Sequence, residues 1–151
     1  FERDRPCVFT SATLGIGERD LSYFRNRVGA QDVEAIQIGS PFDYAEQMKI
    51  HLVKEMPMPN MHGYEEALVK WIKHFIQLSG GRAFVLFTSY KLLQKVAGEM
   101  GGFFDDHEIE LLVQGNGKSR GQLIDSFKED ETSVLFGTDS FWTGVDVPGK
   151  H

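Results

Sequence analysis

The sequence predicts a three-layer α/β/α domain, in which helices cover both faces of a mostly parallel sheet. Short apolar runs alternate along the chain with amphipathic segments of helical spacing, and this alternation is typical of strand–helix units. The runs are continuously apolar, as expected of strands that are covered on both faces. The main strands are therefore expected at residues 8–9, 83–87, 110–113 and 134–136.

The first part of the chain is expected to combine short strands with one helix. The helix is predicted over residues 19–28, and two further apolar runs predict strands at 35–38 and 49–53. The segment MPMPNMHG, residues 56–63, contains two prolines and a glycine and is expected to form an exposed connection.

Three amphipathic helices are expected after this connection. The first is predicted over residues 64–79 and the second over 92–100, each with apolar residues at helical spacing. The third begins at Ser119-Arg-Gly-Gln122, which has the capping-box pattern that often starts a helix. Each helix precedes or follows a predicted strand, as a parallel sheet requires.

Composition excludes several classes of protein. The chain has 151 residues, enough for one domain with its own core. No apolar run approaches the roughly 20 residues of a membrane helix, and FERDRP does not resemble a signal peptide, so we expect a cytoplasmic protein without a membrane partner. The single cysteine, Cys7, is expected to be a buried thiol, and it excludes a disulfide framework within the chain.

The sequence contains no recognisable metal site or phosphate-binding loop. The 5 histidines are scattered, so surface or packing roles are expected for them, and no metal ligands are predicted. The glycines of QGNGK lie too close to Lys118 for a Walker A loop.

The net charge of −6 is concentrated in one segment. Five acidic residues and no Lys or Arg lie between Val96 and Gly117, so the remainder of the chain is close to neutral. This acidic run precedes a predicted strand and is expected at the sheet edge opposite the strand ends. The negative charge therefore does not exclude a nucleic-acid partner, and Lys118 and Arg120 are expected to face the site.

Four segments rich in hydroxyls, amides and glycines follow directly on the predicted strands. The carboxyl ends of parallel strands meet at one edge, so we expect these segments to converge there. Short neutral donors suit the phosphate backbone of a nucleic acid, and Tyr90 and Trp142 could stack on a base. Packing of Trp142 under a loop and a helix cap at Thr13 are the alternatives. The segments are Thr10-Ser11-Ala12-Thr13, Thr88-Ser89-Tyr90, Gln114-Gly115-Asn116-Gly117-Lys118 and Gly137-Thr138-Asp139.

Several of these segments resemble motifs of a known family. FTSATL (9–14), SPFDYAEQ (40–47), FVLFTSYKLL (84–93), LLVQG (111–115) and VLFGTDSFWTGVDVPG (134–149) are similar to successive motifs of superfamily 2 helicases. The closest resemblance is to the DinG branch, relatives of XPD. It implies a RecA-like second motor domain over residues 1–151 that lacks its C-terminal end, with 1–14 as the coupling segment at the junction with a first motor domain.

The resemblance also implies roles for individual residues. Ser11, Ala12 and Thr13 match the motif that couples nucleotide state to strand movement. Gly144 and Asp146 match the part of the last motif that approaches the nucleotide cleft. Thr143 stands where many members have Glu, so no role is transferred to it. The implied nucleic-acid-binding residues are Thr88, Ser89, Tyr90, Gln114, Gly115, Arg120, Gly137, Thr138, Asp139 and Trp142.

The implied activity is ATP-dependent DNA unwinding, with 5′ to 3′ polarity as a further implication. Single-stranded DNA in forked or hybrid duplexes is the expected partner, together with the first motor domain of the same polypeptide. ATP and Mg²⁺ would be held mainly by that first domain, any iron–sulfur cluster would lie outside this chain, and the fragment alone is expected to be inactive. Two alternatives stay open: a non-catalytic module that binds single-stranded nucleic acid, and a flavodoxin-like cofactor domain.

Overall fold

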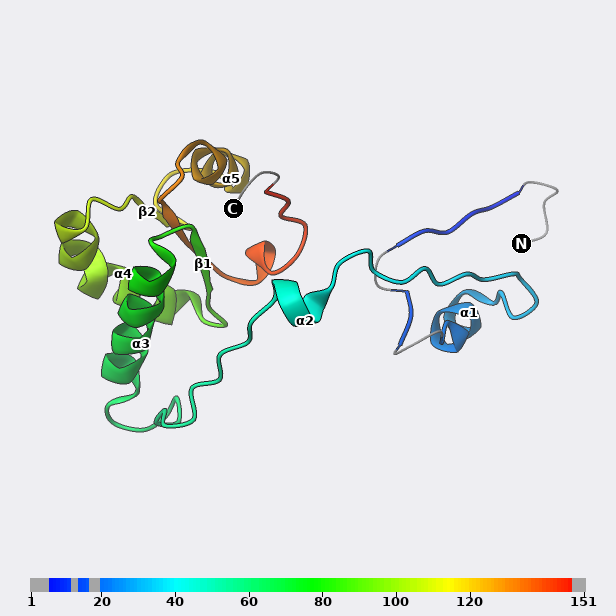
Figure 1. Cartoon of the computed structure of the whole chain (residues 1–151), viewed down its shortest axis with the longest axis horizontal. Coiled ribbons are helices and arrows are strands. Elements are labelled where there is room, and N and C mark those ends of the chain that lie inside the picture. Colours follow the sequence, from blue (N-terminus) through cyan, green and yellow to red (C-terminus); the bar gives the residue numbers. More distant parts are fainter. Residues whose placement is uncertain (1–5, 12–13, 17–19, 148–151) are drawn as a thin grey trace. The chain divides into compact units, whose positions relative to one another are not determined.

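The computed structural model describes residues 6–11, 14–16 and 20–147 (Figure 1). The chain divides into two units, Phe1–Leu52 and Val53–His151. We refer to them as the first and the second unit and describe each by itself.

The first unit contains two short helices, α1 (Ser22–Val28) and α2 (Tyr44–Gln47). Helix α1 ends at Gly29, which has the left-handed φ of 67° common at helix ends. The carboxylate of Asp43 caps α2 by accepting a hydrogen bond from the Ala45 N–H at 3.0 Å. The helix predicted over residues 19–28 is thus confirmed from Ser22 onward.

The predictions of strands at residues 8–9, 35–38 and 49–53 are wrong. None of the residues described in the first unit lies in a strand, and only Ala30 is buried there. Val8 is 86% exposed and Ile38 is 88% exposed. A short apolar run becomes a strand when a neighbouring strand pairs with its backbone and a second layer covers its side chains, and these runs lack that cover. Cys7, expected to be buried, is also exposed.

The second unit is built on a parallel sheet of three strands: β1 (Ala83–Leu86), β2 (Leu111–Val113) and β3 (Val134–Gly137). The strand order is β1-β3-β2, so β3 lies between the other two. Val85 and Val113 are both in register with Phe136, from opposite sides. All four residues of β3 are buried, as their uninterrupted apolar run predicts.

Helices cover both faces of this sheet. The helices α3 (Tyr64–Ser79) and α4 (Tyr90–Asp106) pack on one face, where Val134 and Phe136 point, and α5 (Arg120–Glu129) packs on the other, where Leu135 points (Figure 1). Alternate residues of the central strand therefore belong to two different cores. The predicted three-layer α/β/α architecture is confirmed for the second unit.

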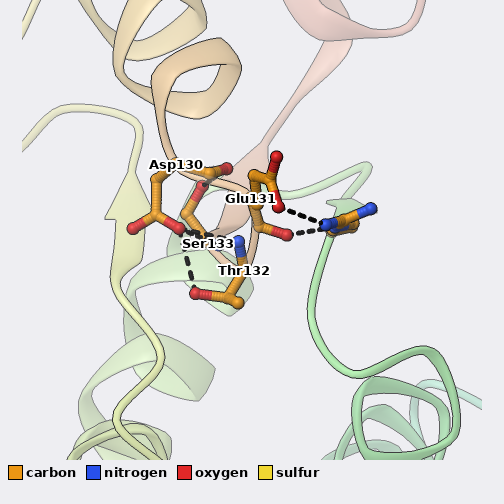
Figure 2. A network of polar contacts seen from close by, with 5 residues as sticks. Asp130, Glu131, Thr132 and Ser133 are labelled. Carbon is orange, nitrogen blue, oxygen red and sulfur yellow. Dashed lines mark hydrogen bonds and ion pairs between the residues drawn. The ribbon is translucent and has the colours of Figure 1, made fainter. Parts of the chain in front are cut away.

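A network of polar contacts fixes the end of the sheet at which the strands begin (Figure 2). One carboxylate oxygen of Asp130 accepts hydrogen bonds from the Thr132 N–H at 2.7 Å, the Thr132 hydroxyl at 2.9 Å and the Ser133 N–H at 3.0 Å. These bonds, that from the Thr132 N–H above all, hold the pKa of Asp130 below its ordinary value of 3.8. Next to it, the guanidinium of Arg82 binds the carbonyl and the carboxylate of Glu131, which ties the residue before β1 to the segment before β3.

None of the helices in the described part of the chain is long and apolar enough to cross a lipid bilayer.

Candidate nucleic-acid interface

Three of the four predicted polar segments meet at the opposite end of the sheet, where its strands end. Backbone hydrogen bonds continue the ladder past the strand ends: the Phe87 N–H donates to the Gly137 carbonyl at 2.8 Å, and the Gln114 N–H donates to the Phe136 carbonyl at 3.0 Å. The segments that begin at Thr88, Gln114 and Thr138 are therefore neighbours, as the parallel topology predicts. We call residues 88–90, 114–120 and 137–146 the strand-end site.

The fourth segment lies in the first unit. Ser11 is exposed, whereas Ala12 and Thr13 lie outside the described residues. The coupling role predicted for these three residues stays a prediction.

The side chain of Gln114 organises the centre of the site. Its Oε1 accepts hydrogen bonds from the Thr138 N–H at 2.7 Å and from the Thr138 hydroxyl at 2.9 Å. Its Nε2 lies 3.4 Å from the Ser140 hydroxyl, and its backbone carbonyl accepts a bond from Gln94 Nε2 at 2.9 Å. One amide thus links the end of β2 with the first turn after β3, and it satisfies a backbone N–H that has no strand partner.

The turn after β3 is anchored from below by an aromatic ring. Residues Asp139–Phe141 form a short 3-10 helix, and Phe141 is buried in the core that β3 shares with α5. A Cβ atom at position 137 would lie 2.6 Å from Phe141 Cδ2, so only glycine fits there. Trp142, next along the chain, is 55% exposed, which excludes the alternative that its ring packs under the loop.

Arg120, the first residue of α5, binds this loop from the side. Its Nε donates to the Ser140 carbonyl at 2.9 Å, and its Nη2 lies 3.2 Å from the Thr143 carbonyl and 3.0 Å from the Gly144 carbonyl. The guanidinium carbon also lies 5.5 Å from the ring centre of Phe141, within cation–π range. Its predicted contact with nucleic acid stays a prediction.

The segment after β1 presents a hydroxyl and an aromatic ring. Thr88 and Ser89 are exposed, and the Ser89 Oγ caps α4 by accepting a bond from the Leu92 N–H at 3.3 Å. Tyr90 is 49% exposed and lies against Gly115. Gly115 has a φ of 92°, and a Cβ atom there would lie 1.8 Å from the Tyr90 hydroxyl oxygen, so both backbone and neighbour require glycine.

The prediction that Lys118 faces the strand ends is wrong. Its Nζ lies 3.5 Å from a carboxylate oxygen of Glu110 and 3.0 Å from the Ser126 hydroxyl. Glu110 directly precedes β2, so the carboxylate draws the flexible lysine chain away from the strand ends. The donors that the site presents are consequently mainly neutral, since the guanidinium of Arg120 is bound to carbonyl oxygens of the loop.

The later part of the loop alternates between the core and the solvent. Val145 and Val147 are half-buried and pack against the α5 side of the core, while Asp146 between them is exposed. Gly144 has a left-handed φ of 69°. Gly144 and Asp146, the two residues predicted for the nucleotide cleft, are therefore exposed, while the valines next to them hold the loop against the core.

Sequence reasoning missed the residues that support the site. Gln94, Ser140 and Phe141 touch the predicted site residues without having been predicted themselves. A signal existed for Phe141, a large apolar residue that follows three polar ones, Thr138 to Ser140, after the buried strand. Nothing in the sequence marks Gln94 or Ser140 as the hydrogen-bond partners of Gln114.

The fold and the site together define the class of this domain. It is an α/β domain with polar donors gathered where parallel strands end, the position at which such sheets bind their ligands. The chain belongs to the helicase C-terminal domain family, whose model matches residues 72–151. The resemblance expected from the sequence is thereby confirmed, and the flavodoxin-like alternative is excluded.

Known relatives are similar over nearly the whole chain. The ATP-dependent DNA helicase YoaA of Escherichia coli is 34% identical over 142 residues, which are 94% of this chain and 22% of the relative. The 3′-5′ exonuclease DinG of Bacillus subtilis is 36% identical over 157 residues, covering 100% of this chain and 17% of the relative. The ATP-dependent DNA helicase DinG of Photobacterium profundum is 30% identical over 99% of this chain and 22% of the relative. The chain thus spans about a fifth of the length of these relatives, and no solved structure matches it significantly.

Proposed function

We propose that this chain is part of an ATP-dependent DNA helicase and that its second unit contacts the backbone of single-stranded DNA at the strand-end site. The names of the relatives support the helicase activity. The observation that carries the DNA contact is the Gln114–Thr138–Ser140 cluster, which gathers donors from two strand ends at one edge of the sheet. Its donors are hydroxyl and amide groups, which position a phosphate backbone without reading bases.

The proposed contact surface consists of exposed or half-buried groups from all three strand ends. Hydroxyls of Ser89 and Thr138 and the exposed backbone at Gly115 would bind phosphates, while the rings of Tyr90 and Trp142 would stack on bases. The remaining members of the surface are Thr88, Gln114 and Asp139, and the buried Gly137 completes the predicted set by allowing the turn that packs on Phe141.

We propose that Gly144 and Asp146 form one side of the ATP cleft. ATP is the substrate in this proposal, and the rest of its site would be supplied by a first motor domain of the same polypeptide. Among the described residues there is no group of three His, Cys, Asp or Glu side chains that could hold a metal ion. We therefore assign no Mg²⁺ ligand among the described residues, and the proposal places the ion mainly with the first motor domain.

The first test is ATP hydrolysis by the full-length polypeptide that contains this chain, measured with and without single-stranded DNA. We expect stimulation by DNA, and we expect the 151-residue chain alone to show none. DNA-stimulated turnover by that chain alone would contradict the shared cleft.

The second test removes single donors from the proposed surface. We expect Thr138→Ala and Ser89→Ala to weaken DNA binding by about 0.5–1.5 kcal/mol each, and by the same amount on every base sequence. Thr132→Ala is the matched control, since the Thr132 hydroxyl also donates to a side-chain oxygen at 2.9 Å but lies where the strands begin. A loss confined to particular base sequences would refute a backbone contact.

A non-catalytic module for single-stranded nucleic acid is the second candidate. It predicts DNA binding by the full-length polypeptide with no effect of DNA on ATP hydrolysis. Asp146→Asn separates the two further: a helicase role predicts that DNA-stimulated ATPase falls more than DNA affinity does. The reverse pattern would place Asp146 on the DNA side.

The helicase proposal has four further parts. They are the coupling role of Ser11, Ala12 and Thr13, the 5′ to 3′ polarity, the preference for forked or hybrid duplexes and the cytoplasmic location.

A further inference from the structure

We infer that Arg120 is a positioning residue that holds the two halves of the loop after β3 in one fixed arrangement, and that it does not itself bind a phosphate. This inference rests on the proposed function for its consequence in DNA binding, but the contacts that carry it lie within the second unit.

The loop has two halves with different proposed roles. Thr138 and Asp139 belong to the proposed DNA surface, and Gly144 and Asp146 to the proposed nucleotide cleft. Arg120 contacts both, since its Nε binds the Ser140 carbonyl and its Nη2 binds the carbonyls of Thr143 and Gly144. One rigid, planar group therefore sets the distance between the two halves.

The geometry favours a role within the protein over a phosphate contact. Three carbonyl oxygens receive N–H groups from two nitrogens of the guanidinium, and its carbon lies 5.5 Å from the ring centre of Phe141. These carbonyls belong to a loop that has only a single 3-10 turn of its own, so they lack the partners that a longer helix or a strand would give them. A phosphate that took the same N–H groups would leave the carbonyls unpaired, so these bonds leave a phosphate only the two N–H groups of Nη1.

The side of α5 that carries Arg120 is itself fixed. Ser119 caps the helix with a capping box: its Oγ accepts from the Gln122 N–H at 3.3 Å, and its own N–H donates to Gln122 Oε1 at 2.8 Å. Leu123 and Phe127 anchor the same helix in the core beneath the sheet. The guanidinium is therefore held by a rigid element and can impose order on the loop.

Lysine cannot replace arginine in this role. Its ammonium is a single nitrogen on a flexible chain and cannot reproduce the fixed spacing of the two nitrogens that bind the three carbonyl oxygens. A phosphate contact, in contrast, depends largely on the positive charge, which lysine keeps. Arg120→Lys therefore separates the two roles, with Arg120→Met as the variant that also loses the charge.

The experiment uses the full-length polypeptide and two measurements. Hydrogen–deuterium exchange of the peptide that covers residues 138–146 reports loop order without any ligand. The affinity for a single-stranded oligonucleotide is then measured over a range of salt concentrations. Log affinity falls as log salt rises, and each phosphate contact by a charged side chain adds about 0.7 to the steepness of this slope. Arg82→Lys is the matched control. Like Arg120, Arg82 donates to a backbone carbonyl; it also binds a carboxylate, and it lies at the end of the sheet where the strands begin.

We expect both Arg120 variants to raise exchange in the loop and to weaken DNA binding about tenfold with an unchanged salt slope, and Arg82→Lys to do neither. The inference is overturned if exchange stays at the wild-type level, or if Arg120→Lys binds DNA like the wild type while Arg120→Met lowers the slope by about 0.7. If the wild-type polypeptide binds no DNA, the proposed function fails, and the exchange measurement alone still decides whether Arg120 orders the loop.

Discussion

The contact between Gly115 and Tyr90 gives a prediction that links backbone geometry to DNA binding. Gly115→Ala places a Cβ atom 1.8 Å from the Tyr90 hydroxyl oxygen and 2.9 Å from Cζ, where ordinary contacts are 3.4–4 Å. The ring must therefore leave its place. Tyr90 is 49% exposed, so it can swing into the solvent without unfolding the domain.

A matched pair of glycines in the same loop separates the expected loss of stability from the expected loss of DNA affinity. Gly115 has a φ of 92° and Gly117 a φ of 86°, but a Cβ atom at Gly117 would meet nothing within 4 Å. Either alanine is expected to lower the free energy of unfolding by about 1–2 kcal/mol, because a side chain is strained at positive φ. Only Gly115→Ala displaces Tyr90, and the loss of one stacked base weakens DNA binding by about 1–3 kcal/mol, or roughly 5- to 150-fold.

The assay compares single-stranded DNA affinity and urea unfolding for both glycine variants, Tyr90→Ala and the double variant Tyr90→Ala/Gly115→Ala. We expect Gly115→Ala to bind DNA as weakly as Tyr90→Ala, and the double variant to be no weaker, because the ring is already displaced. Equal DNA binding by the two glycine variants would refute the reasoning. So would additive losses in the double variant.

Three further predictions concern stability. Leu135→Ala in the central strand, at 0% exposure, should lower the free energy of unfolding by about 2–5 kcal/mol, and a loss under about 1 kcal/mol in urea unfolding would contradict its place in the core. Gly81→Ala should be far more destabilising than Gly80→Ala, since both have positive φ but only the former puts a Cβ atom 1.9 Å from the Thr132 carbonyl oxygen; equal melting temperatures would argue against that contact. The pKa of Asp130 is lowered in the folded state, so its stabilising effect is present above the ordinary pKa of 3.8 and is lost as pH falls below it. Unfolding measured between about pH 5 and about pH 2 should therefore show the difference between wild type and Asp130→Asn shrinking as the pH falls, and a difference that stays constant would speak against this role.

The second unit was predictable because its local and global signals agree. Each apolar run at β1, β2 and β3 is flanked by segments with helical spacing, so the sequence contains both the strands and the layers that cover them. The runs at 8–9 and 35–38 lie on either side of the helical segment 19–28, but no residue of the helix α1 that forms there is buried, so it supplies no second layer. The run at 49–53 contains the polar residues Lys49 and His51. An apolar run reports that a segment is suited to burial; it becomes a strand only where another element buries it.

The site was predictable in its position but not in its contacts. The ends of parallel strands follow from topology, and the polar residues there follow from the sequence. Lys118 and Arg120 are only two positions apart, yet one side chain reaches Glu110 before β2 and the other reaches the loop after β3. Long side chains choose their partners through rotamers and nearby acceptors, and spacing along the chain does not encode either.

The contacts of the loop after β3 bear on how this surface would bind DNA. The Thr138 backbone is held by Gln114, Gly137 lies against Phe141, and the carbonyls of Ser140 and Gly144 are held by Arg120. These contacts order the loop before any ligand is present, so binding need not supply that ordering free energy. The Thr138 hydroxyl already donates a hydrogen bond to Gln114 Oε1. If the hydroxyl donated to a phosphate instead, Gln114 Oε1 would keep only the hydrogen bond from the Thr138 N–H. The net gain per contact is then the difference between two similar hydrogen bonds, which is why single hydroxyl deletions are expected to have small and sequence-independent effects.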